Sequence, residues 1–276
     1  LDLSKNKLMA HDVYMIRCAD AAVRPDDGTL TIYPGAQMDT LEDAKILVDV
    51  ENKLHEYYNS RIHIASSQIY SANGYIDYVD ENKKKHSIFI KEINPLSGHS
   101  VGKGEITKEE ALALSPAFNF FGKVQINAQD TNYHFDGGVQ ISTECYDKEA
   151  AWIKFAAQID PHSIYIPISE APVDIDNNRI TASVLFNPET LEPKIAFLTS
   201  DIEGDNLMLS AKGFLTYDKA KKQYIIASKE KLEDWTLFGD YLTFGKTSCK
   251  IKGQGNIKMG LPIDGAVQMN NYGTIS

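Results

Sequence analysis

The sequence is short of several features that would indicate particular classes of protein. Basic side chains number 28 against 38 acidic ones, and only four of the basic residues are arginine. A net charge of −10 repels nucleic acid and anionic membranes, and so few arginines leave little scope for bidentate binding of phosphates or bases. We therefore expect no nucleic-acid partner.

Long apolar runs are also missing. No stretch approaches the roughly 20 apolar residues that a helix needs to cross a bilayer, and the apolar run at residues 163–168 is interrupted by Pro167. The chain is not expected to span a membrane. It begins at Leu1 without a leader peptide, which indicates a processed product or a piece of a longer protein. None of its asparagines begins an N-x-Ser/Thr sequon, which favours a bacterial source.

Cysteine and histidine form no pattern typical of a metal site. Cys18, Cys145 and Cys249 are too few and too scattered for a disulfide framework or a zinc site, so we expect buried thiols. The seven histidines include no H-E-x-x-H motif and no pair at metal-ligand spacing. The sequence thus predicts no metal and no cofactor.

Most of the chain alternates apolar with polar residues over short runs, which is typical of half-buried strands. Turn-forming residues separate these runs, as at 24–28, 80–82, 136–138 and 176–178. The pattern predicts a mainly β protein, built either as a repeat-based β-roll or solenoid-like fold or as a sandwich of short antiparallel strands. Because no long linker divides residues 1–276, we expect a single β-rich domain.

Helical pattern is scarce, and one or two short helices are expected. Thr107 and Glu110 form a capping box, in which each side chain can satisfy an exposed amide of the other, and this predicts a short helix. Residues 146–155 are a second candidate, and residues 40–49 fit either a helix or a strand.

Parts of the sequence recur. Residues 71–78 match residues 210–217, and both segments are followed by a charged turn with paired lysines. Residues 118–122 are echoed at 235–239, and residues 122–126 at 137–141. These echoes indicate an internal duplication, about 60–145 and 205–260.

The recurrence predicts that residues 69–93 and 208–232 superpose as strand–turn–strand units. Gly74 and Gly213 then occupy equivalent backbone positions, at a bulge or corner where a side chain would obstruct the neighbouring strand.

The glycine-punctuated segments at 74–78 and 121–126, together with the charged turn between them, resemble strand repeats of OstA-like envelope proteins. They are also similar to repeat segments of large uncharacterised surface proteins in Bacteroides-type bacteria. The OstA-like resemblance implies an open β-roll that carries lipopolysaccharide between bacterial membranes. It further implies an apolar groove for acyl chains and no catalytic residues.

The recurring aromatic residues have two interpretations. The first is a core shared between stacked strands, which we expect to be closed and fully packed. The second is a stacking surface for a sugar or a lipid, since Tyr and Phe present flat apolar faces. If they bind a ligand, eight side chains should line one continuous interior open along one edge: Tyr75, Tyr78, Phe118, Phe121, Phe214, Tyr217, Trp235 and Phe238.

Residues 98–102 fit G-x-S-x-G, the motif that exposes a nucleophilic serine on a sharp strand-to-helix turn. No helix is expected directly after Ser100, so a surface loop is the preferred interpretation. The alternative is a serine hydrolase in which His134 or His162 takes the proton from Ser100.

Three further segments match known functional motifs less well. Residues 245–247 resemble the end of a phosphate-binding loop, but Asp240 stands where its first glycine belongs. Residues 174–178 resemble the start of a calcium loop, although a hairpin turn accounts for them better. Asp130 and Asp136 could form a glycosidase pair on a polysaccharide.

Together these observations predict a non-catalytic module of the bacterial cell envelope, in the periplasm or on the outer surface. It would scaffold or bind through its strand faces, with a protein, a glycan or a lipid as partner. A serine hydrolase using Ser100 and a lipopolysaccharide-binding β-roll are the alternatives.

Overall fold

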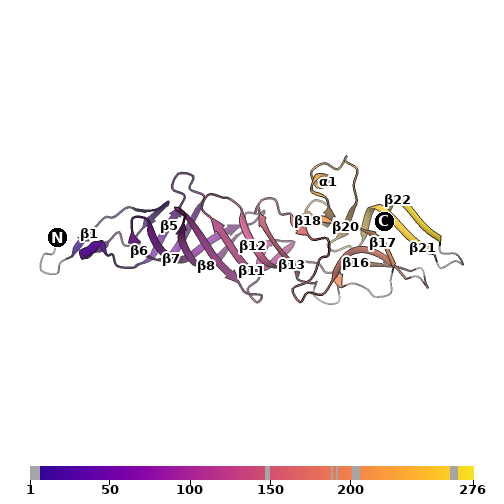
Figure 1. The fold of residues 1–276 in the computed structure, drawn as a ribbon, viewed down its shortest axis with the longest axis horizontal. Coiled ribbons are helices and arrows are strands. Elements are labelled where there is room, and N and C mark those ends of the chain that lie inside the picture. Colours follow the sequence, from indigo (N-terminus) through magenta and orange to yellow (C-terminus); the bar gives the residue numbers. More distant parts are fainter. Residues whose placement is uncertain (1–6, 147–149, 188, 191, 201–205, 262–266) are drawn as a thin grey trace. The chain divides into compact units, whose positions relative to one another are not determined.

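In the computed structural model almost all of the regular secondary structure of the described residues is β-strand (Figure 1). The structure describes residues 7–146, 150–187, 189–190, 192–200, 206–261 and 267–276.

Within these residues the elements follow in this order: β1 (Leu8–Ala10), β2 (Ile16–Cys18), β3 (Ala21–Arg24), β4 (Leu30–Ile32), the 3₁₀ turn η1 (Pro34–Ala36), β5 (Leu41–Val48), β6 (His55–Ser66), β7 (Ile69–Val79), β8 (Lys85–Leu96), β9 (His99–Ile106), β10 (Leu112–Ser115), β11 (Phe118–Asn127), β12 (Tyr133–Ile141), β13 (Ile153–Ile159), β14 (Ile166–Ile168), β15 (Ile180–Phe186), β16 (Pro193–Ser200), β17 (Asn206–Ser210), β18 (Gly213–Asp218), β19 (Gln223–Ala227), α1 (Lys229–Glu233), β20 (Tyr241–Gly245), β21 (Ile251–Leu261) and β22 (Val267–Ile275).

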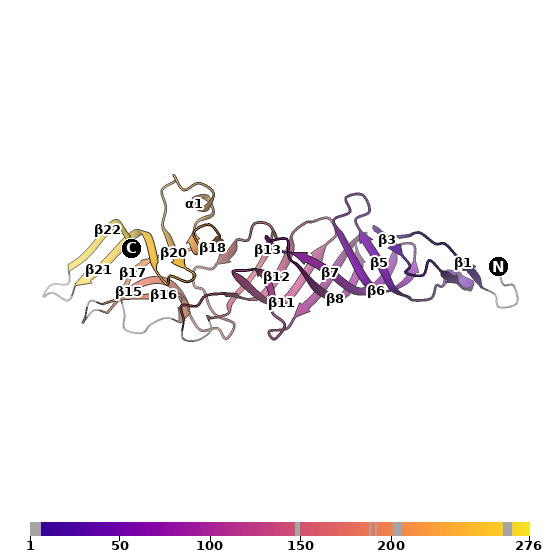
Figure 2. The same ribbon diagram turned by 180° about the vertical axis from the view of Figure 1, so that it is seen from behind.

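The largest sheet has 11 strands, in the order β13-β12-β11-β9-β8-β7-β6-β5-β3-β2, with β10 paired to β11. Its hairpins pair antiparallel, as in β5–β6, β6–β7, β7–β8 and β8–β9. Strands β5 to β9 curl around their buried face (Figures 1 and 2). The expectation of a mainly β, antiparallel protein is confirmed, and strands β5 to β9 of the large sheet form an antiparallel meander.

Three smaller sheets complete the described structure. Six strands pair in the order β14-β18-β19-β20-β21-β22, three in the order β16-β15-β17, and two as β1-β4.

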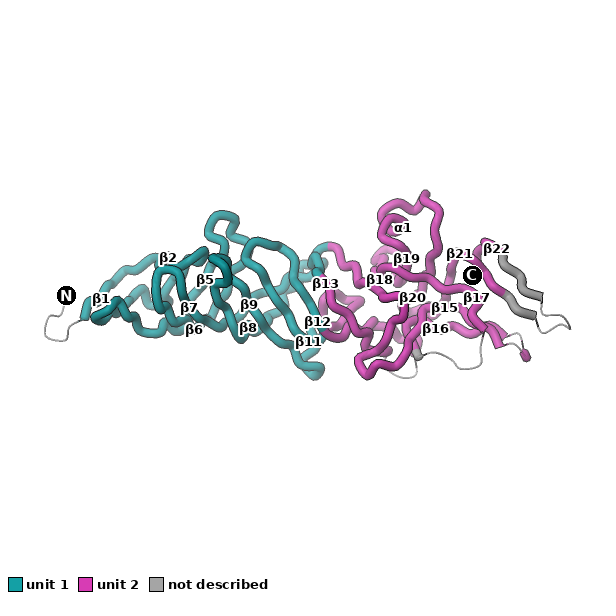
Figure 3. The backbone as a smooth tube through the Cα atoms, viewed as in Figure 1, with its two compact units in different colours: residues 1–112, 121–136, 158–162 teal, residues 113–120, 137–157, 163–276 magenta. Residues whose placement is uncertain are grey.

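Compactness divides the chain into two units (Figure 3). Unit 1 comprises residues 1–112, 121–136 and 158–162, and unit 2 comprises residues 113–120, 137–157 and 163–276. The single domain and the duplication of 60–145 and 205–260 stay predictions, because compactness alone does not show whether a unit folds by itself.

The core of unit 1 follows from the alternation in the sequence. Along β7 every second side chain is buried, and β6 and β8 show the same period over most of their length. Tyr78 is fully buried and meets the rings of Tyr133 and Phe135 edge-on, with centroids 5.3 and 6.2 Å away. Such edge-to-face contacts between aromatic rings stabilise a core beyond the area they bury.

The described residues contain one short α-helix, within the expected number of one or two, but it does not lie at a predicted position. Thr107 Oγ1 does accept a hydrogen bond from the Glu110 amide at 3.3 Å, but the chain makes only a turn there before entering β10. Pairing of β10 with β11 outweighs the local capping preference. Within residues 40–49 the segment Leu41–Val48 forms the strand β5, and residues 153–155 begin β13, while residues 147–149 lie outside the described residues.

The α-helix of the described chain, α1, was not predicted. Ser228 caps it, since its side chain accepts a hydrogen bond from the Lys231 amide at 3.3 Å. A helix of five residues is too short to show a period of apolar positions, so its pattern carries little signal.

The two matching segments form hairpins of different local geometry. Residues 69–93 lie in the hairpin β7–β8, and residues 213–227 form the hairpin β18–β19, which is followed by α1. Gly213 has φ +115°, whereas Gly74 lies within β7 without a positive φ. The predicted equivalence of these two glycine positions is therefore wrong.

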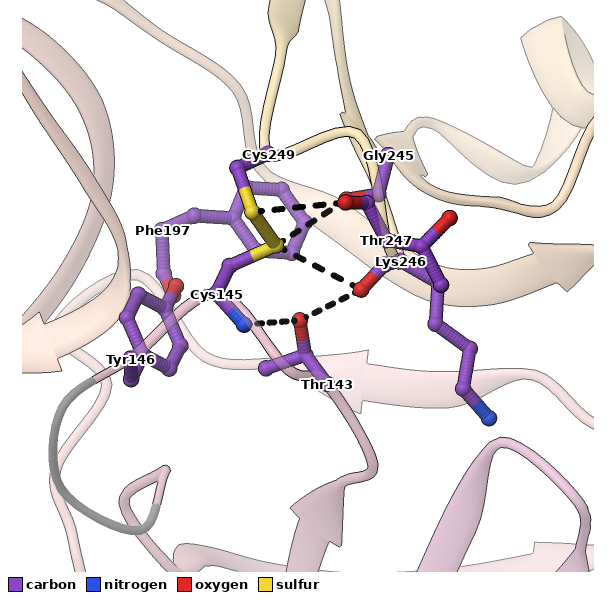
Figure 4. The surroundings of a disulfide bond; sticks show 8 residues. All are labelled: Thr143, Cys145, Tyr146, Phe197, Gly245, Lys246, Thr247 and Cys249. Carbon is purple, nitrogen blue, oxygen red and sulfur yellow. Dashed lines mark hydrogen bonds between the residues drawn. A yellow bond between two sulfur atoms is a disulfide. The ribbon is translucent and has the colours of Figure 1, made fainter.

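A disulfide joins Cys145 and Cys249, whose Cα atoms are 5.3 Å apart (Figure 4). Beside it, Thr143 Oγ1 donates a hydrogen bond to the Lys246 carbonyl at 2.8 Å. The prediction of buried thiols is wrong for this pair. The two cysteines are 104 residues apart in the sequence, and only the fold brings them together. Cys18 is a buried free thiol, as predicted.

Candidate functional site

Three aromatic side chains form a row across adjacent strands of unit 1. Tyr58 of β6 pairs in register with Tyr75 of β7, and Tyr75 pairs with Phe89 of β8. The ring centroids of Tyr58 and Tyr75 are 6.0 Å apart at 25°, and those of Tyr75 and Phe89 are 5.1 Å apart at 54°. We call these residues the aromatic row.

The alternation of the strands places the aromatic row on the face opposite the core. Phe89 lies between the buried Ile88 and Ile90, so its own side chain must point outward. Tyr75 is 38% exposed and Phe89 45% exposed. Cross-strand contacts hold the rings against one another, so they form a continuous aromatic surface in which the ring of Phe89 is tilted by 54° from that of Tyr75.

A polar network orients one end of the aromatic row. The Tyr58 hydroxyl donates a hydrogen bond to Asp77 at 2.8 Å and accepts one from the Ser87 hydroxyl. Lys85 Nζ lies 2.9 Å from the other carboxylate oxygen of Asp77. The hydrogen bond from Lys85 is the main cause that lowers the pKa of Asp77, so this carboxylate is ionised at neutral pH.

A hollow of about 220 Å³ adjoins this network. Its lining residues are Leu54, His55, Glu56, Tyr58, Ile76, Asp77, Lys85 and Tyr133. Burial lowers the pKa of His55, so its ring is neutral at neutral pH, and its Nε2 donates to the Asp130 carbonyl at 2.6 Å. Burial also raises the pKa of Tyr133 to about 12, which keeps its hydroxyl protonated.

A second hollow, of about 370 Å³, is lined by residues of the same three strands and by Thr40, which precedes β5. It is bounded by Thr40, Arg61, His63, Ser71, Ala72, Asn73, Lys91, Glu92 and Asn94. Along β7, Asn73 of this hollow and Asp77 of the smaller one lie two residues to either side of Tyr75. The aromatic row is therefore flanked on both sides by polar groups.

The eight aromatic residues predicted to share one interior do not do so. Tyr78 is buried in unit 1 and Phe118 in unit 2, where its ring lies 5.7 Å from that of Tyr224. Tyr75 faces outward although it shares β7 with Tyr78, because the two are three positions apart. The others lie in unit 1 or unit 2 as half-buried or exposed side chains: Phe121, Phe214, Tyr217, Trp235 and Phe238.

Trp235 and Phe238 belong to a structured loop after α1. The ammonium group of the buried Lys231 donates to the carbonyls of Trp235 at 2.8 Å and Leu237 at 2.6 Å. Phe238 stacks on Tyr272 with ring centroids 4.2 Å apart, yet it is 79% exposed. These contacts fix the loop and leave its aromatic side chains at the surface.

Ser100 lies neither on a strand-to-helix turn nor in the surface loop that the sequence favours, so the surface-loop prediction is wrong. It is the second residue of β9, and its side chain is 1% exposed. Its amide donates to Asp20 at 2.8 Å, its hydroxyl donates to the same carboxylate, and the Tyr70 hydroxyl donates to Ser100. His134 and His162 are not among these partners, so the contacts of Ser100 are those of a buried structural hydroxyl.

Replacing Ser100 by alanine is expected to lower the free energy of unfolding by about 1–3 kcal/mol, because Asp20 and Tyr70 each lose a partner. Urea unfolding measures this loss, and the exposed Ser163→Ala is the control. Hydrolysis of p-nitrophenyl acetate should be the same before and after the change. Unaltered stability together with lost turnover would instead assign Ser100 a nucleophilic role.

The three segments that match other motifs have local structural roles. Asp174 accepts hydrogen bonds from the amides of Asp176 and Asn178 at 2.9 and 2.8 Å, which confirms the hairpin turn. Lys246 lies in the turn after β20 and donates to the Pro116 carbonyl at 2.8 Å. Asp130 accepts from the Asn132 amide at 2.9 Å, and its pairing with Asp136 as a glycosidase site stays a prediction.

Sequence reasoning identified Tyr75 of this site but missed Tyr58 and Phe89.

Within the described residues, no group of three or more His, Cys, Asp or Glu side chains is placed to hold a metal ion. In the same part of the chain, no helix has the length and apolar character needed to cross a membrane.

No family model matches the chain, and no curated protein or solved structure matches it either. The resemblance to OstA-like proteins therefore stays a prediction.

Proposed function

We propose that the protein is a non-catalytic module of the bacterial cell envelope or surface that binds extended, neutral glycans on the outer face of β6, β7 and β8. The observation that carries this proposal is the aromatic row of Tyr58, Tyr75 and Phe89, which lies in register between two polar hollows with Tyr58 half-buried and the other two rings exposed.

The aromatic row suits the apolar C–H faces of sugar rings. Its rings follow one another at 5.1 and 6.0 Å across the strands, so consecutive sugar units of an extended chain can each meet a ring. Tyr and Phe have few rotatable bonds, so they lose little conformational entropy on binding, and cross-strand contacts already hold these three side chains in place. The ligand would therefore lie across the strands, along the row.

The hollows suit the hydroxyl groups of the same ligand. Asn73, Asn94 and His63 line the larger hollow, and Glu56 and His55 line the smaller one, so donors and acceptors flank the row. The charges that line the two hollows balance, with Arg61, Lys85 and Lys91 against Glu56, Asp77 and Glu92. Arg61 lies 3.0 Å from Glu42, and Lys85 lies 2.9 Å from Asp77. This balance favours a neutral glycan over an anionic one.

The disulfide supports the location outside the cytoplasm. Cys145 and Cys249 are close enough to be bonded, and disulfides persist mainly in oxidising compartments such as the periplasm or the cell exterior.

The lipopolysaccharide-binding β-roll implied by the resemblance is less well supported. Such a role needs an apolar interior between strand faces for acyl chains, whereas the aromatic row lies on the outer face of a sheet between polar hollows. A hydrolase is not favoured by any specific contact of Ser100.

Titration calorimetry with linear hexasaccharides of glucose, xylose, mannose and N-acetylglucosamine tests the proposal. At least one should bind, and Tyr75→Ala should weaken it about tenfold, a loss of about 1.4 kcal/mol, because the central ring of the row is removed. Tyr75 is an outward-facing side chain, so the variant should stay folded.

The matched control is Phe238→Ala, which removes an exposed aromatic ring from unit 2 and should leave the affinity unchanged. Absence of binding to all four glycans, or equal weakening by both variants, would refute the proposed site.

A further inference from the structure

A cavity of about 380 Å³ lies within unit 2, apart from the aromatic row, which belongs to unit 1. It is surrounded by strands β15 and β17, by the end of β14 and the residues that follow it, by the residue before β15, and by the two residues after β17. Its walls are formed by Ile168, Ser169, Glu170, Ala171, Pro172, Arg179, Ile180, Thr181, Ala182, Ser183, Leu185, Leu207, Ser210, Ala211 and Lys212. This volume falls in the range of small-molecule sites.

The charge in the cavity wall is unbalanced. Lys212 is paired with the carboxylate of Glu170, so these two charges offset each other. Arg179, one of only four arginines in the chain, also lines the cavity. Its guanidinium forms no hydrogen bond or ion pair in the part of the chain that the structure describes. One cationic group is thus left for a ligand.

The rest of the lining mixes hydroxyl and apolar groups. The hydroxyls of Thr181 and Ser183 hydrogen-bond to each other, and Ser183 is fully buried. Ile168, Leu185 and Leu207 contribute apolar surface. Transfer of an apolar body from water to such a surface contributes roughly 25 cal/mol for each Å² buried.

We propose that this cavity binds a small organic monoanion, a carboxylate with a short apolar body. A guanidinium presents two parallel N–H donors that match the two oxygens of a carboxylate, which is a stronger and more directional contact than an ammonium offers. One unpaired cation neutralises one negative charge, so a singly charged carboxylate fits better than a doubly charged phosphate ester. The apolar wall accommodates the remainder of the molecule.

Calorimetric titration of the whole chain with octanoate tests this inference, with octylamine and octanol as probes of the same length and different charge. Octanoate should bind more tightly than either. Arg179→Gln should weaken the binding of octanoate at least tenfold. Arg179→Lys should weaken it less, since lysine keeps the positive charge but lacks the two parallel N–H donors of the guanidinium. The control is Arg24→Gln, in unit 1, which should have no effect.

A second variant keeps the test independent of folding defects. Glu170→Gln removes an exposed carboxylate and releases the Lys212 ammonium, so octanoate affinity should rise several-fold. Three results would overturn the inference: no octanoate binding, octanol or octylamine binding as tightly as octanoate, or an affinity indifferent to Arg179→Gln. Since the aromatic row takes no part, the outcome does not depend on glycan binding.

Discussion

Replacing both Cys145 and Cys249 by serine is expected to lower the free energy of unfolding by about 4 kcal/mol. The disulfide closes a loop of 104 residues, and a crosslink of that length removes a large share of the conformational freedom of the unfolded chain. Urea unfolding of the wild-type protein, with and without reductant, and of the double variant measures the effect.

Reductant serves as the internal control. It should destabilise the wild-type protein by the same amount as the double substitution and leave the double variant unchanged, because Cys18 has no partner cysteine. A wild-type protein that is indifferent to reductant, or that shows three free thiols on labelling after denaturation, would contradict the crosslink. Such a result would also remove the support that the disulfide gives to a location outside the cytoplasm.

Gly213→Ala is expected to cost about 3 kcal/mol or more. Gly213 has φ +115°, a conformation that strains any side chain, and a Cβ there would lie 2.4 Å from the Ala227 carbonyl oxygen. Because the obstacle is backbone, no neighbouring side-chain substitution can relieve it. Thermal or urea unfolding gives the loss.

Gly74→Ala is the matched comparison, since its obstacle is a side chain. A Cβ at this position would lie 2.2 Å from Ser60 Oγ, an atom that is buried without a hydrogen-bond partner. Adding Ser60→Gly should therefore recover much of the stability lost in Gly74→Ala. If the double variant recovers none of it, or if Gly213→Ala is tolerated, the distinct local roles assigned to the two glycines are incorrect.

The strands could be predicted from the sequence because the alternation of apolar and polar residues can be recognised within one strand, without knowing which strand it pairs with. β6, β7 and β8 follow this period, and the ambiguity at 40–49 was resolved in favour of a strand by pairing in the sheet. The capping box at Thr107 was misleading because a local preference of about 1 kcal/mol is smaller than the energy of strand pairing across β10 and β11.

The contacts between distant segments could not be predicted. Cys145 and Cys249 meet only through the fold of unit 2. Tyr58 and Phe89 join Tyr75 only through the strand register, which a one-residue shift would destroy. One signal was available, since Phe89 is an aromatic residue at an outward position of an alternating strand, where polar residues are usual.

The most direct test of glycan binding at the aromatic row is a map of which side chains the ligand covers. Hydroxyl-radical oxidation followed by mass spectrometry, with and without a saturating concentration of the hexasaccharide that binds, reports the accessibility of each aromatic residue. We expect protection of Tyr58, Tyr75 and Phe89, with Phe238 oxidised equally in both samples. Protection confined to other residues, with the aromatic row still fully reactive, would contradict the assignment of this face as the binding site.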